Sequence, residues 1–159
     1  MLDNMNKIKL IATDFDGIVT DGFVYFSSEY SGELKKVSFK DIMGMSLAVK
    51  NGYKIAIISG EKNSIIDKIA DKFKLEDVHQ GIKDKLAVLL SISEKYKLSL
   101  DQICYLGDDI NDISTLEKVG FAVTVPDSNY KVKNIPNIYI TKANAGNGAF
   151  REIIDLLLD

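Results

Sequence analysis

The sequence is poor in the residues that build disulfides, zinc sites and histidine-dependent triads. It has one cysteine, one histidine, two prolines and no tryptophan among 159 residues. A single cysteine cannot close an internal disulfide, and Cys104 lies in an apolar run typical of a buried position. A serine or cysteine triad would depend on His79 alone, for which a structural role is favoured.

Long hydrophobic runs and strong charge of one sign are also lacking. No run approaches the roughly 20 apolar residues that span a bilayer, and residues 1–9 are polar, unlike a signal peptide. The net charge is −3, with no basic block that would attract nucleic acid. We therefore expect a cytoplasmic protein with neither a membrane nor a nucleic-acid partner.

The length and composition fit one domain. A chain of 159 residues with 46% hydrophobic content can bury one substantial core but is short for two ordinary domains. No internal repeat, low-complexity tract or proline-rich linker divides it. The sequence predicts a single domain over residues 1–159.

Short apolar runs alternate with stretches of helical spacing. The runs, nearly unbroken and typical of buried parallel strands, are residues 8–12, 53–58, 103–106 and 121–125. The stretches with helical spacing are residues 43–49, 64–73, 83–96, 110–119 and 149–158. This alternation predicts an α/β fold, a Rossmann-like, doubly wound parallel sheet.

One segment breaks the alternation directly after the first predicted strand. Residues 22–26 and 33–39 flank a turn-rich stretch at residues 27–32. Two extended arms around such a turn are typical of a β-hairpin. We expect this hairpin to project from the sheet as a flap.

Polar residues follow the predicted strands where ligands bind in open α/β sheets. These residues are Asp14, Asp16, Ser59, Gly60, Asp108 and Asp109. Crowded carboxylates call for a cation, and oxygen ligands beside a phosphate suit Mg²⁺. Asp14 and Asp108 are the first candidates for metal ligands.

The same residue types fit phosphoryl transfer. An aspartate such as Asp14 can attack phosphorus as the nucleophile. Asp16 is suited to protonate the leaving alcohol and later to deprotonate the attacking water. A hydroxyl donor at Ser59 and a fixed positive charge at Lys85 are suited to hold the phosphate.

Four segments resemble, in the expected order, the four motifs of the haloacid dehalogenase superfamily. They are Asp14-Phe15-Asp16-Gly17-Ile18-Val19-Thr20, Ser59, Lys85 and Gly107-Asp108-Asp109-Ile110-Asn111-Asp112. Each motif alone is weak, but four in order across most of the chain are specific. The resemblance implies a phosphatase that forms an aspartyl-phosphate on Asp14, with Asp16 as acid and base.

The resemblance also implies the remaining site residues. Ser59, Gly60 and Lys85 would contact the phosphate. Mg²⁺ would be held by Asp14, the backbone carbonyl of Asp16 and Asp108, and the metal site would be supported by Asp109 and Asp112. An alternative remains for these last two, because acidic residues favour a helix N-terminus in any protein.

The intervals between the motifs are too short for the cap domain that many members of this superfamily carry. A neighbouring subunit is then the candidate for excluding water from the site. The closest resemblance is to the capless tetrameric phosphatases of 3-deoxy-octulosonate 8-phosphate and nonulosonate 9-phosphate. It is carried by Thr20-Asp21-Gly22 and by residues 80–87 and 146–152.

This closer resemblance implies a homotetramer built by the hairpins. It also implies that the glycine-rich residues 146–151 enter a neighbour's active site. The family usually has a glycine pair where this chain has Ala145-Gly146. The alternative for this segment is a flexible connection before the last helix.

The residues after Ser59 bear on the substrate. Octulosonate phosphatases usually have an arginine where this chain has Glu61, and Glu61 with Lys72 resembles the nonulosonate type. The likeness is partial, because Ile69 replaces a frequent basic residue. We expect a nonulosonate 9-phosphate such as KDN 9-phosphate or N-acylneuraminate 9-phosphate, in sugar-acid biosynthesis, with octulosonate 8-phosphate as the alternative.

Thr20 and Lys40 are two further candidates for substrate binding, because they lie near the flap. For Lys40 the alternative is an ordinary solvated lysine.

Three other functions are alternatives to a phosphatase. A signalling receiver domain also gathers aspartates and a lysine, but it has no hairpin. A mutase of this superfamily generally carries a cap, which this chain lacks. A non-catalytic oligomerisation module, like those fused to acylneuraminate cytidylyltransferases, can have degraded motifs, whereas Asp14, Asp16, Lys85 and Gly107-Asp108-Asp109 are all present here.

Overall fold

The computed structural model describes residues 2–29 and 31–159. Within them, six parallel strands form one sheet in the order β3-β2-β1-β4-β5-β6. The strands are β1 (Leu10–Thr13), β2 (Lys54–Ile58), β3 (Asp77–His79), β4 (Ile103–Leu106), β5 (Phe121–Thr124) and β6 (Tyr139–Ile140). The parallel order confirms the predicted doubly wound fold. From β1 the chain adds β2 and β3 on one side and then β4, β5 and β6 on the other, so the direction of winding reverses between β1 and β4.

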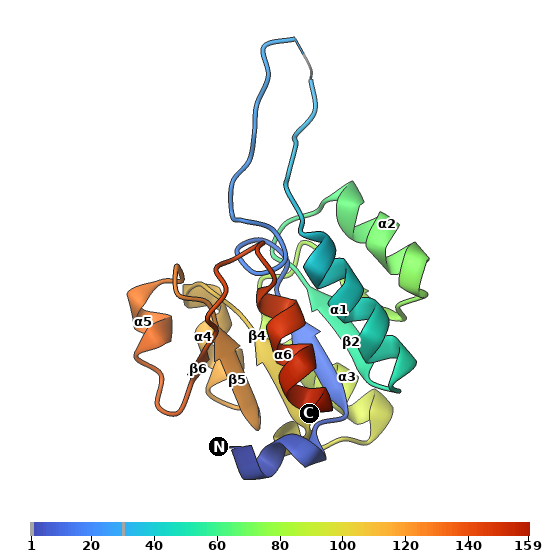
Figure 1. Cartoon of the computed structure of the whole chain (residues 1–159), viewed down its shortest axis with the longest axis vertical. Helices are drawn as coiled ribbons and strands as arrows, with labels where there is room; N and C mark the ends of the chain where they lie inside the picture. The colour runs from blue at the N-terminus through green and yellow to red at the C-terminus, as the bar shows by residue number, and fades with distance from the viewer. Residues whose placement is uncertain (1, 30) are drawn as a thin grey trace.

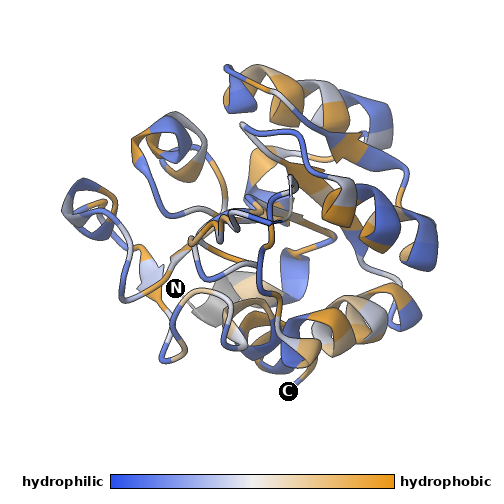
Figure 2. Ribbon diagram, turned by 90° about the horizontal axis from the view of Figure 1, so that it is seen from above, coloured by the Kyte–Doolittle hydropathy of each residue, from blue (hydrophilic) through white to orange (hydrophobic). Residues whose placement is uncertain are grey.

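Helices cover both faces of the sheet (Figures 1 and 2). They are α1 (Phe39–Lys50), α2 (Ser64–Phe73), α3 (Lys85–Tyr96), α4 (Ile113–Leu116), α5 (Tyr130–Lys133) and α6 (Ala149–Leu158). Three 3₁₀ helices are also described: η1 (Leu2–Lys7) before β1, η2 (Leu100–Gln102) before β4 and η3 (Ile110–Asp112) before α4. None of these described helices has both the length and the apolar character that crossing a membrane requires.

The core divides into two layers because successive side chains of a strand point to opposite faces. On β1, Ile11 packs in the layer that includes α1, α2 and α6. Its neighbours Leu10 and Ala12 pack in the layer that includes α3 and α4. Burial on both faces explains why the central strands read as continuous apolar runs.

Helix starts are fixed by local capping. Ser38, Asn63 and Asp84 each accept a hydrogen bond from a backbone N–H in the first turn of α1, α2 and α3. The bounds of α2 and α6 match the predicted helices. The stretch predicted as one helix over residues 110–119 is instead η3 followed by α4, which ends at Leu116.

The flap, described at residues 22–29 and 31–37, projects away from the sheet between β1 and α1 (Figure 1). Its arms run antiparallel and meet at two isolated bridges, Thr20↔Val37 and Tyr25↔Leu34. The hairpin path is as predicted, but the described arms form no continuous ladder, and the second arm ends where Ser38 caps α1. Two strands with no layer to pack against are marginal. Residue 30, in the predicted turn, lies outside the described residues.

Candidate active site

The polar residues predicted at strand ends meet at the carboxyl edge of the sheet. A cavity of about 270 Å³ opens there, beyond β1, β2 and β4. It is lined by Asp14, Asp16, Gly17, Gly22, Ser59, Gly60, Glu61, Asp108, Asp109 and Asn111. This is the position at which the strand order reverses, where doubly wound sheets bind ligands.

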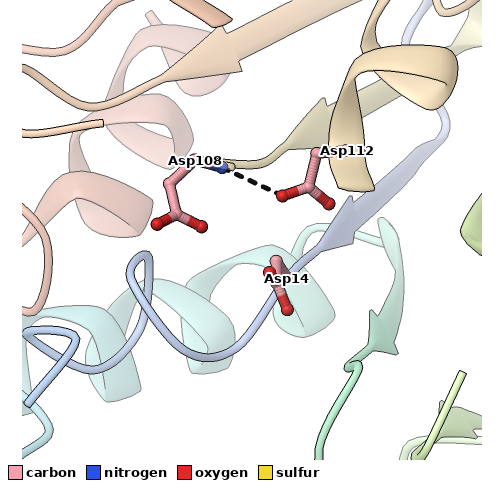
Figure 3. A group of neighbouring side chains, drawn as sticks. All are labelled: Asp14, Asp108 and Asp112. Atoms are coloured by element: carbon pink, nitrogen blue, oxygen red, sulfur yellow. Dashed lines mark hydrogen bonds between the residues drawn. The ribbon is translucent and has the colours of Figure 1, made fainter. Parts of the chain in front are cut away.

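Three carboxylates lie close together, from the residue after β1, the loop after β4 and the end of η3 (Figure 3). One oxygen each of Asp14, Asp108 and Asp112 lies within 4.8 Å of the others. Burial and the neighbouring Asp112 charge raise the pKa of Asp14 to about 7. Burial and the Asp14 charge raise the pKa of Asp108 to about 8. Such a cluster of hard oxygen donors fits Mg²⁺, whose charge would relieve the repulsion.

Asp112 is fully buried and organises the loop around the cluster. Its Oδ1 accepts hydrogen bonds from the Tyr105 hydroxyl (2.6 Å) and Lys85 Nζ (2.8 Å). Its Oδ2 accepts from the backbone N–H groups of Asp108 (3.1 Å) and Asp109 (3.2 Å). These contacts fit the support role predicted for Asp112. Sequence reasoning missed Tyr105, which reads only as part of an apolar strand.

Lys85 begins α3 and reaches the cluster with a fully buried side chain. Its Nζ lies 2.7 Å from Asp14 Oδ2 and 2.8 Å from Asp112 Oδ1. Burial works to lower the pKa of Lys85, but the two facing carboxylates outweigh it and raise the pKa. Lys85 is therefore a permanent cation beside Asp14.

The Asp14-x-Asp16 motif separates its two carboxylates. Gly17 turns the chain with φ +81°, and a side chain there would collide with Asp108. Asp16 then faces a cation rather than the other acids: its Oδ2 lies 2.7 Å from Lys35 Nζ. Lys35 stands on the flap, 19 residues away, so no local motif signalled this contact.

Thr20 lies differently from the substrate-binding position predicted for it. It is fully buried. Its hydroxyl donates to Asp16 Oδ1 (3.2 Å) and accepts from the backbone N–H groups of Gly17 (3.3 Å) and Gly22 (3.2 Å). With no exposed surface, Thr20 shapes the loop and positions Asp16.

Of the other predicted residues, those after β2 and β4 line the cavity. Ser59 is buried, and its hydroxyl accepts a hydrogen bond from the Glu61 backbone N–H (3.2 Å). Glu61 is exposed at the cavity edge. Asp109 also caps η3 by accepting from the Ile110 N–H (2.8 Å), as the helix-start alternative predicts.

Two lysines predicted to bind substrate are absent from the cavity lining. Lys72 is exposed in the last turn of α2, whereas that helix begins near the cavity edge. The rise along the helix from Ser64 to Lys72 is about 12 Å, so Lys72 lies at the end of α2 away from Glu61. Lys40 is exposed at the start of α1, with its Cδ 3.2 Å from the position a Cβ on Gly148 would take.

The glycine-rich segment before α6 packs against its own chain instead of extending outward. The Gly146 N–H donates to the Ile18 carbonyl (2.9 Å). A Cβ on Gly146 would lie 2.5 Å from the backbone nitrogen of Asp21. Gly148 N–H and Arg151 N–H both donate to the buried Asp41 carboxylate, at 3.0 Å each. The segment thus supports the loop at residues 18–21 of the same site.

Comparison with known proteins identifies the family. The sequence profile of the haloacid dehalogenase-like hydrolases matches residues 64–153. The 3-deoxy-D-manno-octulosonate 8-phosphate phosphatase KdsC of Escherichia coli K12 is 33% identical over 153 residues, covering 96% of this chain and 80% of the relative. KdsC of Salmonella typhimurium is 31% identical over 159 residues, covering 99% and 83%.

Comparison with solved structures supports the same family. The octulosonate 8-phosphate phosphatase of Moraxella catarrhalis, in complex with magnesium, phosphate and KDO, superposes with a TM-score of 0.92 at 32% identity, over 99% of this chain and 89% of that one. The protein from Vibrio cholerae described as a putative phosphatase of the same type gives 0.92 and 32%, over 99% and 87%. The chain belongs to the haloacid dehalogenase-like hydrolases, among the phosphatases of the KdsC type.

Proposed function

We propose that this protein hydrolyses 3-deoxy-D-manno-octulosonate 8-phosphate with Mg²⁺, through an aspartyl-phosphate on Asp14. One observation carries the proposal: buried Asp14 has both a carboxylate cluster and the cation of Lys85 beside it, at the mouth of a cavity. The Mg²⁺ would be held by the Asp14 and Asp108 carboxylates and the Asp16 carbonyl. When bound, it would neutralise the cluster and the charge that develops on the phosphate oxygens.

In the first half-reaction, Asp14 attacks phosphorus and the sugar hydroxyl leaves. The Phe15 N–H donates to Asp14 Oδ1 (2.6 Å), and Lys85 contacts Oδ2, so the carboxylate is held in one orientation. The Ser59 hydroxyl and the Gly60 backbone lie across the cavity as donors for the phosphate. Protonated Asp16 gives its proton to the leaving oxygen, and the carboxylate that remains is the ion-pair partner of Lys35.

In the second half-reaction, Asp16 takes a proton from water, which attacks the phosphorus of the aspartyl-phosphate. The bond from phosphorus to Asp14 breaks, phosphate leaves and the Asp14 carboxylate is restored. Asp16 is about one-third exposed on its side chain, at 29%, and lines the cavity, so water can reach it. Asp109 and Asp112 support the loop that carries Asp108.

The relatives support octulosonate 8-phosphate as the substrate, whereas one residue of the cavity, Glu61, supports a nonulosonate 9-phosphate. The KdsC relatives and the Moraxella complex with KDO support octulosonate 8-phosphate. The distance of Lys72 from the cavity weakens the resemblance to nonulosonate phosphatases, although Glu61 does line the cavity. A nonulosonate 9-phosphate is therefore the second candidate, supported by Glu61.

We also propose that the protein works as a homotetramer and that residues 1–159 act as one domain. The single sheet supports the second point. Exposed apolar side chains on the flap support the first: Phe23, Val24, Tyr25, Phe26 and Leu34. Apolar groups gathered on a projecting segment are typical of a contact surface.

Steady-state kinetics test the substrate assignment. Phosphate release with Mg²⁺ is measured from octulosonate 8-phosphate and nonulosonate 9-phosphates for wild type, Glu61→Ala and Lys72→Ala. We expect the highest kcat/KM on octulosonate 8-phosphate and no effect of Lys72→Ala. A preference for a nonulosonate that Glu61→Ala removes would overturn the substrate assignment, and release from none of them would overturn the function.

A further inference from the structure

The Asp16 carboxylate is held at both oxygens from two parts of the chain. Thr20, in its own loop, donates to Oδ1 at 3.2 Å. Lys35, on the return arm of the flap, donates to Oδ2 at 2.7 Å. The Lys35 side chain is only 4% exposed, so this ion pair is shielded from water on the lysine side.

The flap backbone directs Lys35 to this contact. The bridges Tyr25↔Leu34 and Thr20↔Val37 lie on either side of Lys35 and Lys36 and fix the register of the return arm. Successive side chains of an extended arm point in opposite directions. Lys35 therefore points to the site, whereas Lys36 is 56% exposed and pairs with Asp21 at 3.1 Å.

An inward, nearly buried lysine needs a partner, since burying an unpaired ammonium is costly. Asp16 is the only partner within ion-pair distance of Lys35 among the described residues. Without Lys35, the Asp16 side chain would keep only the Thr20 contact, at 3.2 Å. Its orientation toward the cavity would then be less restricted.

We propose that Lys35 is a positioning residue for Asp16. It orients the Asp16 side chain for proton exchange by pairing with the carboxylate that remains once Asp16 has given its proton to the leaving oxygen, and it makes that orientation depend on the seated flap. The inference rests on the acid/base role proposed for Asp16. No residue next to Asp14 or Asp16 in the sequence supplies this contact, so the flap takes part in the chemistry.

The proposal has a signature that a purely structural role lacks. An alkoxide leaving group needs a proton as the bond to phosphorus breaks, whereas p-nitrophenolate leaves readily without one. Misorienting Asp16 should therefore slow the transfer of phosphate to Asp14 more from alkyl phosphates than from p-nitrophenyl phosphate. Loss of a phosphate contact or of the fold would slow both alike.

The test compares Lys35→Met with Lys35→Arg and with the matched control Lys36→Met. Values of kcat and KM are measured with Mg²⁺ on octulosonate 8-phosphate and on p-nitrophenyl phosphate. We expect Lys35→Met to lower kcat/KM on the sugar phosphate roughly 10- to 100-fold, a part of the usual general-acid contribution. On p-nitrophenyl phosphate kcat/KM should change by less than about threefold, because this parameter covers binding and the phosphorylation of Asp14 but not the second half-reaction, and this leaving group needs no acid.

Lys35→Arg should recover part of the loss, and Lys36→Met should match wild type on both substrates. A double variant, Lys35→Met with Asp16→Asn, should be no slower than Asp16→Asn alone if Lys35 acts through Asp16. Equal losses of kcat/KM on both substrates, or a raised KM with kcat unchanged on the sugar phosphate, would overturn the proposal. If wild type hydrolysed p-nitrophenyl phosphate but no sugar phosphate, the substrate assignment would fail while the Lys35 test could proceed on another alkyl phosphate.

Discussion

The carboxylate cluster and the flap are held by different means. Asp14 follows β1, Lys85 begins α3 and Asp112 ends η3; all three are buried, and each has fixed partners. The flap is tied by two isolated bridges and the Lys35–Asp16 ion pair, with Phe26 at 79% exposed. The nucleophile and its charged partners are thus held at the edge of the sheet, whereas the Lys35 contact to Asp16 is made by a segment that the sheet does not stabilise.

The largest expected effect on stability lies on the cluster side. Lys85→Met removes the cation between two buried carboxylates, Asp14 and Asp112. We expect the free energy of unfolding in Mg²⁺-free buffer to fall by about 3 kcal/mol, as for a broken buried ion pair. Urea unfolding measures it.

The matched control for Lys85→Met is Lys36→Met on the flap. That pair is partly exposed, so the variant should change the free energy of unfolding by less than about 1 kcal/mol. Equal changes for the two variants would contradict the contrast between cluster and flap.

Proton binding also distinguishes the carboxylate cluster from the flap. Asp14 and Asp108 have pKa values raised from 3.8 to about 7 and about 8 in the Mg²⁺-free protein. Such carboxyls bind protons more tightly in the folded state, so the free energy of unfolding should fall as pH rises from about 4 to about 8. Thermal unfolding across this range, without Mg²⁺, is the measurement.

With Mg²⁺ bound, the free energy of unfolding should instead rise with pH, because the ion displaces the protons from Asp14 and Asp108. Its affinity should rise between pH 6 and 8, by up to about tenfold per pH unit for each proton released. Calorimetric titration with Mg²⁺ at several pH values measures the change. Affinity independent of pH would exclude Asp14 and Asp108 as protonated groups in the free protein.

The glycine-rich segment before α6 contacts the loop at residues 18–21, which leads from Asp14 into the flap. Gly146 has φ +64° and no room for a Cβ beside Asp21, whereas Gly52 has φ +81° but nothing within 4 Å. Gly52→Ala should cost about 1 kcal/mol of backbone strain, and Gly146→Ala about 2 kcal/mol or more once the clash is added. Only Gly146→Ala should also lower kcat, since it displaces the loop that carries Thr20. Similar kinetics for both variants would show that the segment does not support the site.

The smallest effect on subunit stability is expected at the flap tip. Phe26→Ser removes an exposed apolar ring and should change the unfolding free energy of a subunit by less than about 0.5 kcal/mol. If the flaps build the proposed tetramer, light scattering should show dissociation at concentrations at which wild type stays assembled. An unchanged assembly state would remove the flap from the interface.

The contrast also explains what the sequence could predict. Strand ends such as Asp14, Ser59 and Asp108 were predictable because apolar runs locate parallel strands and the carboxyl ends of these strands share one edge. The two-residue strand β6 and the four-residue helix α5 were missed because they are too short to show periodicity.

Contacts made across the fold were beyond local patterns. The Lys35–Asp16 pair depends on how the flap folds back, and Tyr105 meets Asp112 through the turn after β4. Lys72 was assigned to the site by resemblance, although helix length carries it away from the end of α2 near the cavity. The resemblance implied that Gly146 enters a neighbour's site, and the bond from its backbone N–H to the Ile18 carbonyl of its own chain had no signal in the sequence.

The central claim, that Asp14 is the nucleophile, is tested most directly by trapping the intermediate. The enzyme is mixed with Mg²⁺ and substrate, quenched within a turnover and reduced with borohydride, which converts an acyl phosphate to an alcohol. Peptide mass spectrometry should then find homoserine at position 14 only when substrate and Mg²⁺ are both present, and none in Asp14→Asn, which should release no phosphate. Reduction at another aspartate, or phosphate release by Asp14→Asn at the wild-type rate, would contradict the account.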